Sequence, residues 1–470
     1  MHGFRHRLLA GLLLLTVTGG LGCKGASPEI AAAAKPFTLT VWGMFDDSDA
    51  YQGIITDYRA AHPYVQVQYK KLRPEEYTDT LLNTLAEDRG PDIFLVHNTK
   101  VREYESKIAP MPTSISLAEL VLKGTVKKEA AYELHQKNLL TLRQLQTQFP
   151  DQVVRDTALT VQVPNAKGGT VPTQKIFGLP LSIDSLALFW NRELLNAAGI
   201  AQPPATWTEV QQQVKKLTKA DAVGNIIQSG AALGTAKNIS RGTDMLSLLM
   251  MQNGTQMSGE DDYPTFNLVP QELQGRPTPP GAEALIFYTD FANPKKEVYT
   301  WNDTLPDSFD AFVTGQTAMM LGYSYQVPLI QARAPKLKFG IAPAPQIPGN
   351  AEKNFANYWL YTVSKKSKHQ DIAWDFLQFM SSEKEVQKYL AVTNLPTALR
   401  TLIPSQTENL DLGVFANQIL TAESWYHGAD ADAMAEIFRD MIAQALLGEK
   451  PVEIINRSVD RVAQTIRQRE

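Results

Sequence analysis

Apolar and polar positions in the first part of the chain follow the patterns of strands and helices in turn. Residues 37–41 alternate as a strand does, and residues 65–69 repeat that alternation after a segment with helical spacing. A helical stripe then runs from Tyr77 to Leu85, and residues 92–96 give a short, mostly apolar run. Such a run is typical of a strand buried on both faces of a parallel sheet. The order predicts an α/β layer with a mostly parallel sheet.

The rest of the chain also contains both element types. Residues 114–149 are predicted to be helical, residues 171–181 to form a hairpin or strand, and residues 186–190 to form an apolar strand. Residues 259–281 hold many prolines and glycines among polar residues, which indicates a surface loop. Residues 431–447 and 452–468 each carry an apolar stripe and are predicted to be amphipathic helices.

The amino end has the pattern of a targeting segment. Arg5 and Arg7 precede an apolar stretch from Leu8 to Val17, which is shorter than the roughly 20 residues of a membrane-spanning helix. Gly20-Leu-Gly-Cys23 follows and resembles a bacterial lipobox, although Gly20 stands where that pattern prefers leucine. We expect residues 1–22 to be a signal peptide, Cys23 to carry the lipid, and residues 23–36 to be a tether. The alternatives are a buried cysteine or an ordinary secretory signal cleaved nearby.

Composition and missing motifs exclude several classes of protein. The 470 residues carry a net charge of −4, which argues against a nucleic-acid binder. Cys23 is the single cysteine, so a disulfide scaffold and a cysteine-based zinc site are excluded. The sequence contains no HExxH, GxxxxGK[ST], GxGxxG or GxSxG pattern. We therefore expect no metal, no cofactor and no catalytic residues, in a chain long enough for two or three domains.

Several segments of the chain match, in order, the motifs of one known family. Gly90-Pro-Asp-Ile93 matches a characteristic strand, and Phe177-Gly-Leu-Pro-Leu181 begins the most specific segment. The remaining matches are Thr40-Val-Trp42, Phe189-Trp-Asn-Arg192, Ala198-Gly199, Thr206-Trp207, Phe312 to Met319, Tyr358-Trp359 and Ala373 to Leu377. Together they resemble the carbohydrate-binding group of extracellular solute-binding proteins that serve ABC importers, the group of maltose-binding protein. Residues 110–175 are longer than the corresponding part of the family and are interpreted as an insertion.

The resemblance implies an α/β fold of two lobes, with the solute held in a cleft between them. It assigns residues 37–183 and 318–357 to lobe one, and residues 187–317 and 360–470 to lobe two. The chain is expected to cross the hinge near Asp184, Ala318 and Trp359. It also implies a monomer on the outer face of the cytoplasmic membrane, which captures a sugar or oligosaccharide and delivers it to importer permeases by hinge closure.

Sugar sites combine flat aromatic side chains with fixed hydrogen-bonding groups, because a desolvated hydroxyl without a partner costs about 1–3 kcal/mol. Strand ends and crossings therefore supply the candidate ligand-binding residues, with one of the two residues Tyr323 and Tyr325 expected to serve. The candidates are Trp42, Asp46, Asp47, Asn98, Asp184, Tyr323, Tyr325, Trp359, Trp425 and Tyr426. Phe45 and His97 lie beside them, and Trp301 with Asn302 is a weaker pair.

Other interpretations of these residues stay open. Trp42 and Trp359 could be core residues, and the acidic run after Phe45 could be a solvated helix cap. Trp207 and Trp374 lie on helical stripes and are interpreted as packing residues. Two other functions are a glycan sensor or adhesin without transport, and a glycosidase that uses Asp46 and Asp184 as a carboxylate pair.

Overall fold

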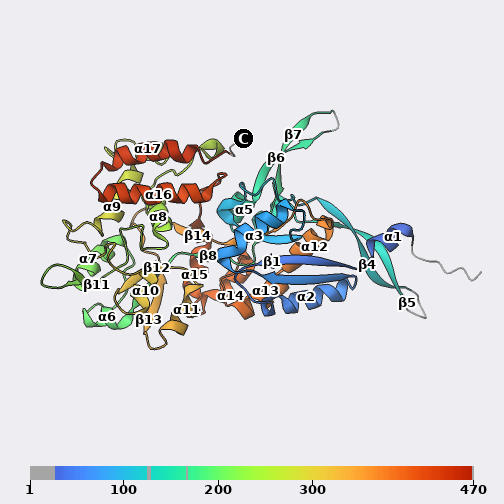
Figure 1. Ribbon diagram of the computed structural model, residues 1–470, viewed down its shortest axis with the longest axis horizontal. Coiled ribbons are helices and arrows are strands. Elements are labelled where there is room, and N and C mark those ends of the chain that lie inside the picture. Colours follow the sequence, from blue (N-terminus) through green and yellow to red (C-terminus); the bar gives the residue numbers. More distant parts are fainter. Residues whose placement is uncertain (1–26, 124–128, 166–167, 468–470) are drawn as a thin grey trace, which may run out of the picture.

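The protein consists of two lobes arranged along its longest axis (Figure 1). The computed structural model describes residues 27–123, 129–165 and 168–467. Cys23 and the expected signal peptide lie outside the described residues. Within the described parts of the chain, no helix is long and apolar enough to cross a membrane. Each lobe has its own hydrophobic core, so each buries its elements independently of the other.

Lobe one is built on a four-stranded sheet with the order β15-β3-β1-β2. The strands β1, β2 and β3 are parallel to one another, as predicted, and β15 runs antiparallel to β3. The strands are β1 (Phe37–Gly43), β2 (Val65–Lys71), β3 (Ile93–His97) and β15 (Trp359–Val363). The helices of this lobe are α1 (Pro28–Ala33), α2 (Asp49–Ala61), α3 (Pro74–Ala86), α12 (Gln370–Met380), α13 (Glu383–Thr393), α14 (Ile403–Thr407) and α15 (Gly413–Gln418).

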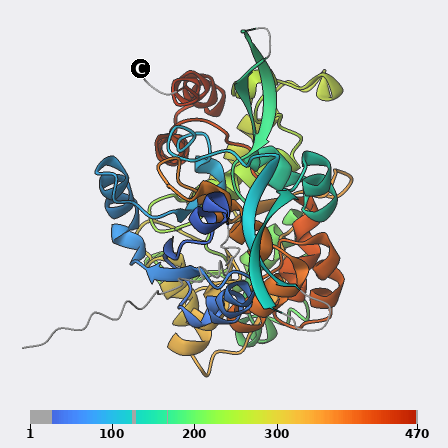
Figure 2. The ribbon, with the colours of Figure 1, turned by 90° about the vertical axis from the view of Figure 1, so that its right-hand side faces the viewer.

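The segment interpreted as an insertion contributes two hairpins and two short helices to lobe one, and both hairpins extend from its body (Figures 1 and 2). Its elements are β4 (Ser114–Lys123), β5 (Glu129–Asn138), α4 (Leu142–Gln148), α5 (Asp151–Thr157), β6 (Ala158–Pro164) and β7 (Thr170–Ile176). The predicted helix over residues 114–149 is therefore wrong for residues 114–123 and 129–138, which form strands. Ile115 and Leu117 are buried while Ser116 is exposed, which is the two-residue period of a strand.

Lobe two contains a three-stranded sheet in which β9 pairs with β12 on one side and β13 on the other, both antiparallel. Its main strands are β9 (Ala187–Asn191), β12 (Met319–Gly322) and β13 (Phe339–Pro343), with a small ribbon of β10 (Lys219–Ala220) and β11 (Ile226–Gln228). The helices around them are α6 (Arg192–Ala197), α7 (Trp207–Leu217), α8 (Gly242–Gln252), α9 (Pro280–Asp290), α10 (Ser308–Val313), α11 (Gln326–Arg333), α16 (Ala431–Leu446) and α17 (Pro451–Ala463). The last two confirm the predicted amphipathic pair.

Three short strands join the lobes side by side. The central strand β14 (Asn354–Asn357) pairs parallel with β16 (Ala422–Glu423) and antiparallel with β8 (Asp184–Ser185). Each strand carries the chain from one core to the other, since Ile183 and Ala422 belong to the core of lobe one, and Leu186 and Trp425 to that of lobe two. The expected first crossing near Asp184 therefore agrees with the structure.

The expected crossing near Trp359 lies beside the crossing strand β14, but the crossing near Ala318 and the lobe assignments after it do not agree with these cores. Residues 318–357 were assigned to lobe one, but Met319 and Met320 are buried in the core of lobe two, where β12 pairs with β9. Residues 360–470 were assigned to lobe two, but β15, α12 and α13 pack in lobe one, and only from Trp425 onward does the chain stay in the core of lobe two. The predicted crossing near Ala318 is therefore wrong. The apolar sequence of a strand shows that the strand is buried, but it does not show in which of the two cores.

Candidate functional site

A cavity of about 540 Å³ lies between the lobes, where the three crossing strands meet. Two hollows of about 640 and 840 Å³ are larger, but their lining comes from lobe one alone. Ligands of open α/β sheets bind beyond the carboxyl ends of strands, which favours the cavity between the lobes. Its lining comprises Phe45, Asp46, Leu95, His97, Leu181, Ser182, Asp184, Arg241, Tyr325, Pro328, Asn357, Tyr358, Trp359, Tyr361, Tyr389, Thr393, Leu395 and Pro396.

Aromatic side chains from both lobes border this cavity. In lobe one, Phe45 packs edge-on against Trp359 with 5.3 Å between ring centroids, and His97 contacts the same indole at 5.1 Å. In lobe two, Tyr325 is 43% exposed and stacks on Tyr323, which is fully buried beneath it. Tyr325 is therefore the residue of this pair that reaches the cavity, and Phe45 is also half-exposed there.

Asp46 is held in place by tyrosines. The hydroxyl groups of Tyr51 and Tyr389 both donate to Oδ2 of Asp46 at 2.8 Å, and Tyr69 donates to its backbone oxygen. Burial raises the pKa of Asp46, although the two tyrosine hydrogen bonds act in the opposite direction. Position 46 follows β1 directly, so the carboxylate lies at the carboxyl end of a parallel strand, where the fold opens toward lobe two.

Asp184 is the second carboxylate of the cavity and belongs to the crossing strand β8. Its Oδ2 accepts from the backbone N–H of Ser324 at 2.8 Å and from the Ser324 hydroxyl at 2.7 Å, while Ser185 N–H donates to Oδ1 at 2.9 Å. Burial nevertheless raises the pKa of Asp184 to about 6, because the carboxylate loses more hydration than these donors restore. Asp184 thereby links the hinge to the strand end that presents Tyr325.

His97, Asn357 and Arg241 are among the lining residues that were not predicted as site residues, although His97 was noted as a neighbour. Nε2 of His97 contacts Oδ1 of Asn357 at 2.7 Å, and burial lowers the pKa of His97 to about 4, so its ring is neutral. Arg241 places its guanidinium 4.6 Å from the Tyr323 ring centroid and pairs with Asp244 at 3.1 Å. The position of Asn357 in a crossing strand could have been a signal, whereas Arg241 lies in a turn without a motif.

Several predicted candidates of lobe one lie outside the cavity lining. Trp42 is buried in the core, with the ammonium of Lys70 4.7 Å from its ring centroid. Asp47 is exposed and pairs with Lys71 at 3.0 Å. Asn98 is buried, and its amide nitrogen donates to Asp156 at 3.0 Å. Asp47 and Asn98 each directly follow a lining residue, so neighbouring side chains of one segment point in different directions.

The candidate aromatic residues that follow the crossing strand β16 also lie outside the cavity lining. Trp425 and Tyr426 are buried in the core of lobe two, where the indole N–H donates to Ser247 at 3.2 Å and the phenol donates to Thr465 at 2.8 Å. Trp301 is fully buried in the same core. Trp207 and Trp374 are buried as well, which confirms their interpretation as packing residues. The chain enters the core of lobe two immediately after β16, which leaves these rings no access to the cavity.

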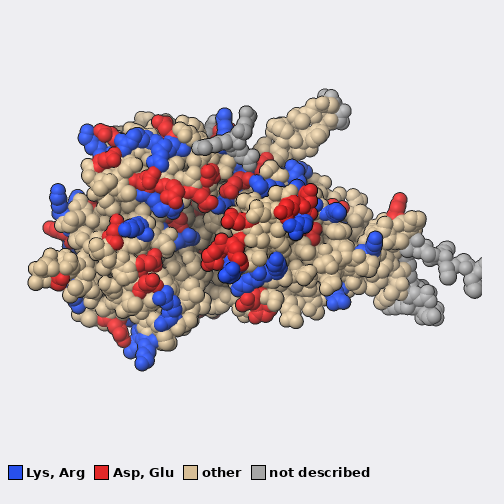
Figure 3. All heavy atoms as spheres, viewed as in Figure 1, with Lys and Arg blue, Asp and Glu red and all other residues tan. Residues whose placement is uncertain are grey.

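The candidate chemistry of the cavity is binding. Among the described residues, no group of three or more His, Cys, Asp or Glu side chains could hold a metal ion. The charged lining groups are already bonded within the protein: Asp46 to tyrosines, Asp184 to Ser324, and Arg241 to Asp244. Acidic and basic side chains are also interspersed over the face in Figure 3, without one continuous basic surface.

Residues 45–387 match the sequence model of a family described as bacterial extracellular solute-binding protein. The chain belongs to this family. It is accordingly an extracellular or periplasmic binding protein, and its family is not one of enzymes. The match includes parts of both lobes and the cavity-lining residues from Phe45 to Tyr361, which confirms the resemblance at the level of the family.

Curated relatives of the solute-binding protein share about a quarter of their residues with it. A putative binding protein of Brucella abortus strain 2308 is 26% identical over 212 residues, 44% of this chain and 46% of that protein. The chain thus spans about half the length of the first curated relatives that it matches. A maltodextrin-binding protein, MdxE, of Bacillus subtilis is 24% identical over 312 residues, covering 63% of this chain and 68% of that protein.

Solved structures confirm the two-lobed α/β fold of the solute-binding protein. A cyclic alpha-maltosyl-1,6-maltose binding protein from Arthrobacter globiformis matches with a TM-score of 0.66 and 19% identity, covering 92% of this chain and 99% of the other. The sugar-binding protein MalE from Xanthomonas citri matches with a TM-score of 0.64 and 17% identity, covering 92% and 97%. At these identities the likeness shows the fold alone.

Proposed function

We propose that this protein binds a neutral sugar or oligosaccharide in the cavity between its lobes and presents it to the permease subunits of an ABC importer. The observation that carries the proposal is the pair of opposed aromatic surfaces, Phe45 with Trp359 in lobe one and Tyr325 in lobe two. Sugar rings expose flat C–H faces that pack on aromatic rings, while their hydroxyls need partners at the edges. Asn357, His97 and the two carboxylates supply such partners.

The internal pairing of charges supports a neutral solute. An ionic solute would need an opposite charge that is free to pair with it, whereas the charges of Asp46, Asp184 and Arg241 are already engaged by protein groups. The Oδ2 atoms of Asp46 and Asp184 each accept two hydrogen bonds from the protein, so Oδ1 of each carboxylate is the atom left to accept from a sugar hydroxyl. The names of several relatives, including a multiple sugar-binding protein of Streptococcus mutans, agree with this class of solute.

The same proposal includes hinge closure and a lipid anchor. The lobes are joined by three short strands, an arrangement that permits closure around a ligand by bending at a few residues. Helix α1 begins at Pro28, five positions after Cys23, so a lipid on that cysteine would hold lobe one close to the outer face of the cytoplasmic membrane. We propose that the anchored protein acts as a monomer.

Calorimetric titration with a panel that includes maltotriose and mannobiose tests the sugar site. Trp359→Ala should weaken binding by about tenfold to seventyfold, because losing roughly 100 Å² of apolar contact at about 25 cal/mol per Å² removes up to about 2.5 kcal/mol. Trp359→Phe should retain most of the affinity, since it keeps an aromatic face. Lys215→Ala is the control, because Lys215 pairs with Glu297 on the surface of lobe two.

Three outcomes would contradict parts of the proposal. Equal affinity of Trp359→Ala and the unaltered protein would remove the aromatic surface of lobe one from the site. Accumulation of a product beyond one equivalent during incubation with any of the sugars would show turnover instead of binding. An unchanged radius of gyration at saturation, measured by solution scattering, would argue against hinge closure.

A further inference from the structure

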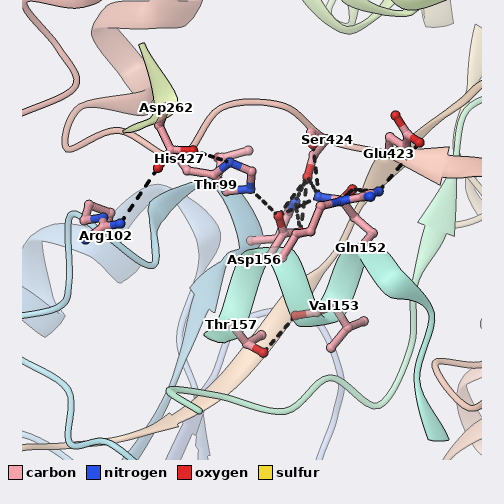
Figure 4. Close-up of polar contacts among 12 residues, drawn as sticks. Thr99, Arg102, Gln152, Val153, Asp156, Thr157, Asp262, Glu423, Ser424 and His427 are labelled. Carbon is pink, nitrogen blue, oxygen red and sulfur yellow. Dashed lines mark hydrogen bonds and ion pairs between the residues drawn. The ribbon is translucent and has the colours of Figure 1, made fainter. Parts of the chain in front are cut away.

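A second polar cluster joins the lobes where helix α5 of the insertion meets the segment after β16 (Figure 4). At its centre lies Asp156, whose side chain has no exposure to solvent. Its carboxylate accepts hydrogen bonds from groups of four segments of the chain. The donors are Asn98 at 3.0 Å, Gln152 at 2.6 Å, the Ser424 hydroxyl, the hydroxyl of Tyr358, and the ring of His427 at 2.8 Å. Tyr358 also lines the cavity, so the cluster adjoins the proposed site.

His427 and Asp156 belong to different lobes. Asp156 lies between Val153 and Leu159, which are both buried in the core of lobe one. His427 directly follows Trp425 and Tyr426, which are buried in the core of lobe two. The hydrogen bond between Nε2 of His427 and Oδ1 of Asp156 therefore crosses the lobe boundary. A rotation of the lobes about the hinge strands would separate these two atoms.

The other ring nitrogen of His427 faces a second carboxylate. Nδ1 lies 3.5 Å from Oδ1 of Asp262, in a short 3-10 segment of lobe two, Glu260–Asp262. A neutral imidazole carries one N–H, so it can donate to one of these two acceptors and would turn a lone pair toward the other. Only the imidazolium form donates to both. The position of His427 between two carboxylates in this structure thus favours the protonated ring.

The remaining charges around His427 also connect the lobes. Arg102 of lobe one lies 3.8 Å from Asp262 and 3.4 Å from Glu105. Lys100, from the same segment, pairs with Asp432 of α16 at 2.5 Å. On the hinge side, Arg155 of α5 lies 3.6 Å from Glu423 of β16. These pairs are partly exposed and contribute little each, whereas the contact of His427 with Asp156 is buried.

We propose that protonated His427 is a latch that holds lobe two to Asp156 of lobe one, so that closure of the cavity over its solute takes up a proton. This inference rests on the proposed function, because it describes how closure over the bound sugar is regulated. Burial by itself would lower the pKa of His427, but the contacts with Asp156 and Asp262 outweigh it and raise the pKa to about 9. In an open protein, Asp156 moves away with lobe one and the pKa falls toward its ordinary value of 6.5.

The direction of the pH effect follows from this difference. Because the closed form has the higher pKa, its extra stability is fully present below pH 6.5 and is lost as the pH rises through about 9. Sugar affinity should therefore decrease between about pH 6.5 and 9, by at least about tenfold and at most about 80-fold. The upper limit applies if His427 has its ordinary pKa when the lobes are open. Asp262 remains beside His427 in either form, which makes the change smaller.

Titration calorimetry with maltotriose near pH 7.8, repeated in buffers of different ionisation enthalpy, counts the protons taken up on binding. We expect about 0.5–0.9 protons per sugar for the unaltered protein, and close to none for His427→Gln and for Asp156→Asn. His135→Gln is the matched control, because His135 lies on the hairpin strand β5 of lobe one and pairs with Glu133. Binding without proton uptake, or uptake that persists in His427→Gln, would overturn the proposal.

A second measurement separates the latch from the sugar proposal. The ring of His427 is titrated by NMR, with its signal assigned from the spectrum of His427→Gln. If maltotriose does not bind, the sugar proposal loses that support, but the latch still predicts a pKa above 6.5 that Asp156→Asn lowers. An unchanged pKa in Asp156→Asn would show that His427 is held by lobe two alone, and the latch would be wrong. No other residue needs to be altered for this test.

Discussion

Replacement of Asp184 by asparagine should change how stability depends on pH. The carboxyl of Asp184 has a pKa of about 6 in the folded protein, against an ordinary value of 3.8, because burial opposes its ionisation. This difference corresponds to about 3 kcal/mol of unfolding free energy. The folded protein holds a proton that the unfolded chain releases at lower pH. The stability from this group is therefore complete below about pH 4 and is lost as the pH rises through about 6.

Asparagine has the shape of the protonated acid but does not ionise in this range. At pH 4 the variant should be less stable by about 1–2 kcal/mol, because an amide nitrogen cannot accept from the Ser324 donors. Between pH 4 and pH 7.5 the difference should shift in favour of the variant by up to about 3 kcal/mol. Near neutral pH the variant should thus equal or exceed the stability of the unaltered protein while binding its solute less tightly.

The assay is urea unfolding of both proteins at pH 4, 5, 6 and 7.5, followed by circular dichroism. Other titrating groups are common to both proteins and cancel in the difference. Asp47→Asn is the control, since Asp47 is an exposed carboxylate and its removal should change stability by less than about 0.5 kcal/mol at every pH. A constant difference in unfolding free energy between Asp184→Asn and the unaltered protein from pH 4 to 7.5 would refute the raised pKa of this buried carboxyl group.

Two further predictions concern the insertion and the amino end. Lys137→Met should lower the unfolding free energy by about 1–3 kcal/mol, because Lys137 on β5 pairs at 2.5 Å with the fully buried Asp375 of α12. In the variant, Asp375 would still accept a hydrogen bond from the hydroxyl of Tyr58, which limits the loss. Urea unfolding measures the change, and a loss no larger than that of the exposed Lys336→Met would contradict it. Cys23→Ala should move the protein from the membrane fraction to the soluble fraction of cells, as detected by immunoblot. Retention on the membrane with an intact signal would disprove the lipid anchor.

The sequence predicted local structure well where burial repeats along one element. The strands β1, β2 and β3 and the paired helices α16 and α17 were expected at nearly their observed positions, because each buries one face or both faces in a regular pattern. The insertion shows the limit of this reasoning. Ile115 and Leu117 alternate as in a strand, but the surrounding glutamine and lysine residues favour a helix by propensity. Pairing with β5 overrides that propensity, and pairing is a tertiary property.

The candidate site was predicted in part for a related reason. Asp46, Asp184, Tyr325 and Trp359 line the cavity, and each lies at a strand end or a crossing that motifs can locate. Trp425 was an equally reasonable aromatic candidate, but its side chain points into the core of lobe two. Arg241 reaches the cavity from a turn that no local pattern marks. Composition identifies what a side chain can bind, whereas the direction of that side chain depends on contacts with residues far away in the chain.

The late position of β15 in the sequence has a consequence for how this protein folds. Its pairing partner β3 precedes it by more than 250 residues, since Trp359 lies opposite His97 and Val363 opposite Ile93. Contacts between such distant residues form slowly, because a long loop must close before they stabilise anything. During synthesis the sheet of lobe one therefore stays incomplete until nearly four-fifths of the chain has been made. Until then one edge of β3 is unpaired, and α12 does not yet cover the core of the lobe. An unpaired apolar strand is prone to aggregation, so the growing chain would benefit from a chaperone that covers this edge.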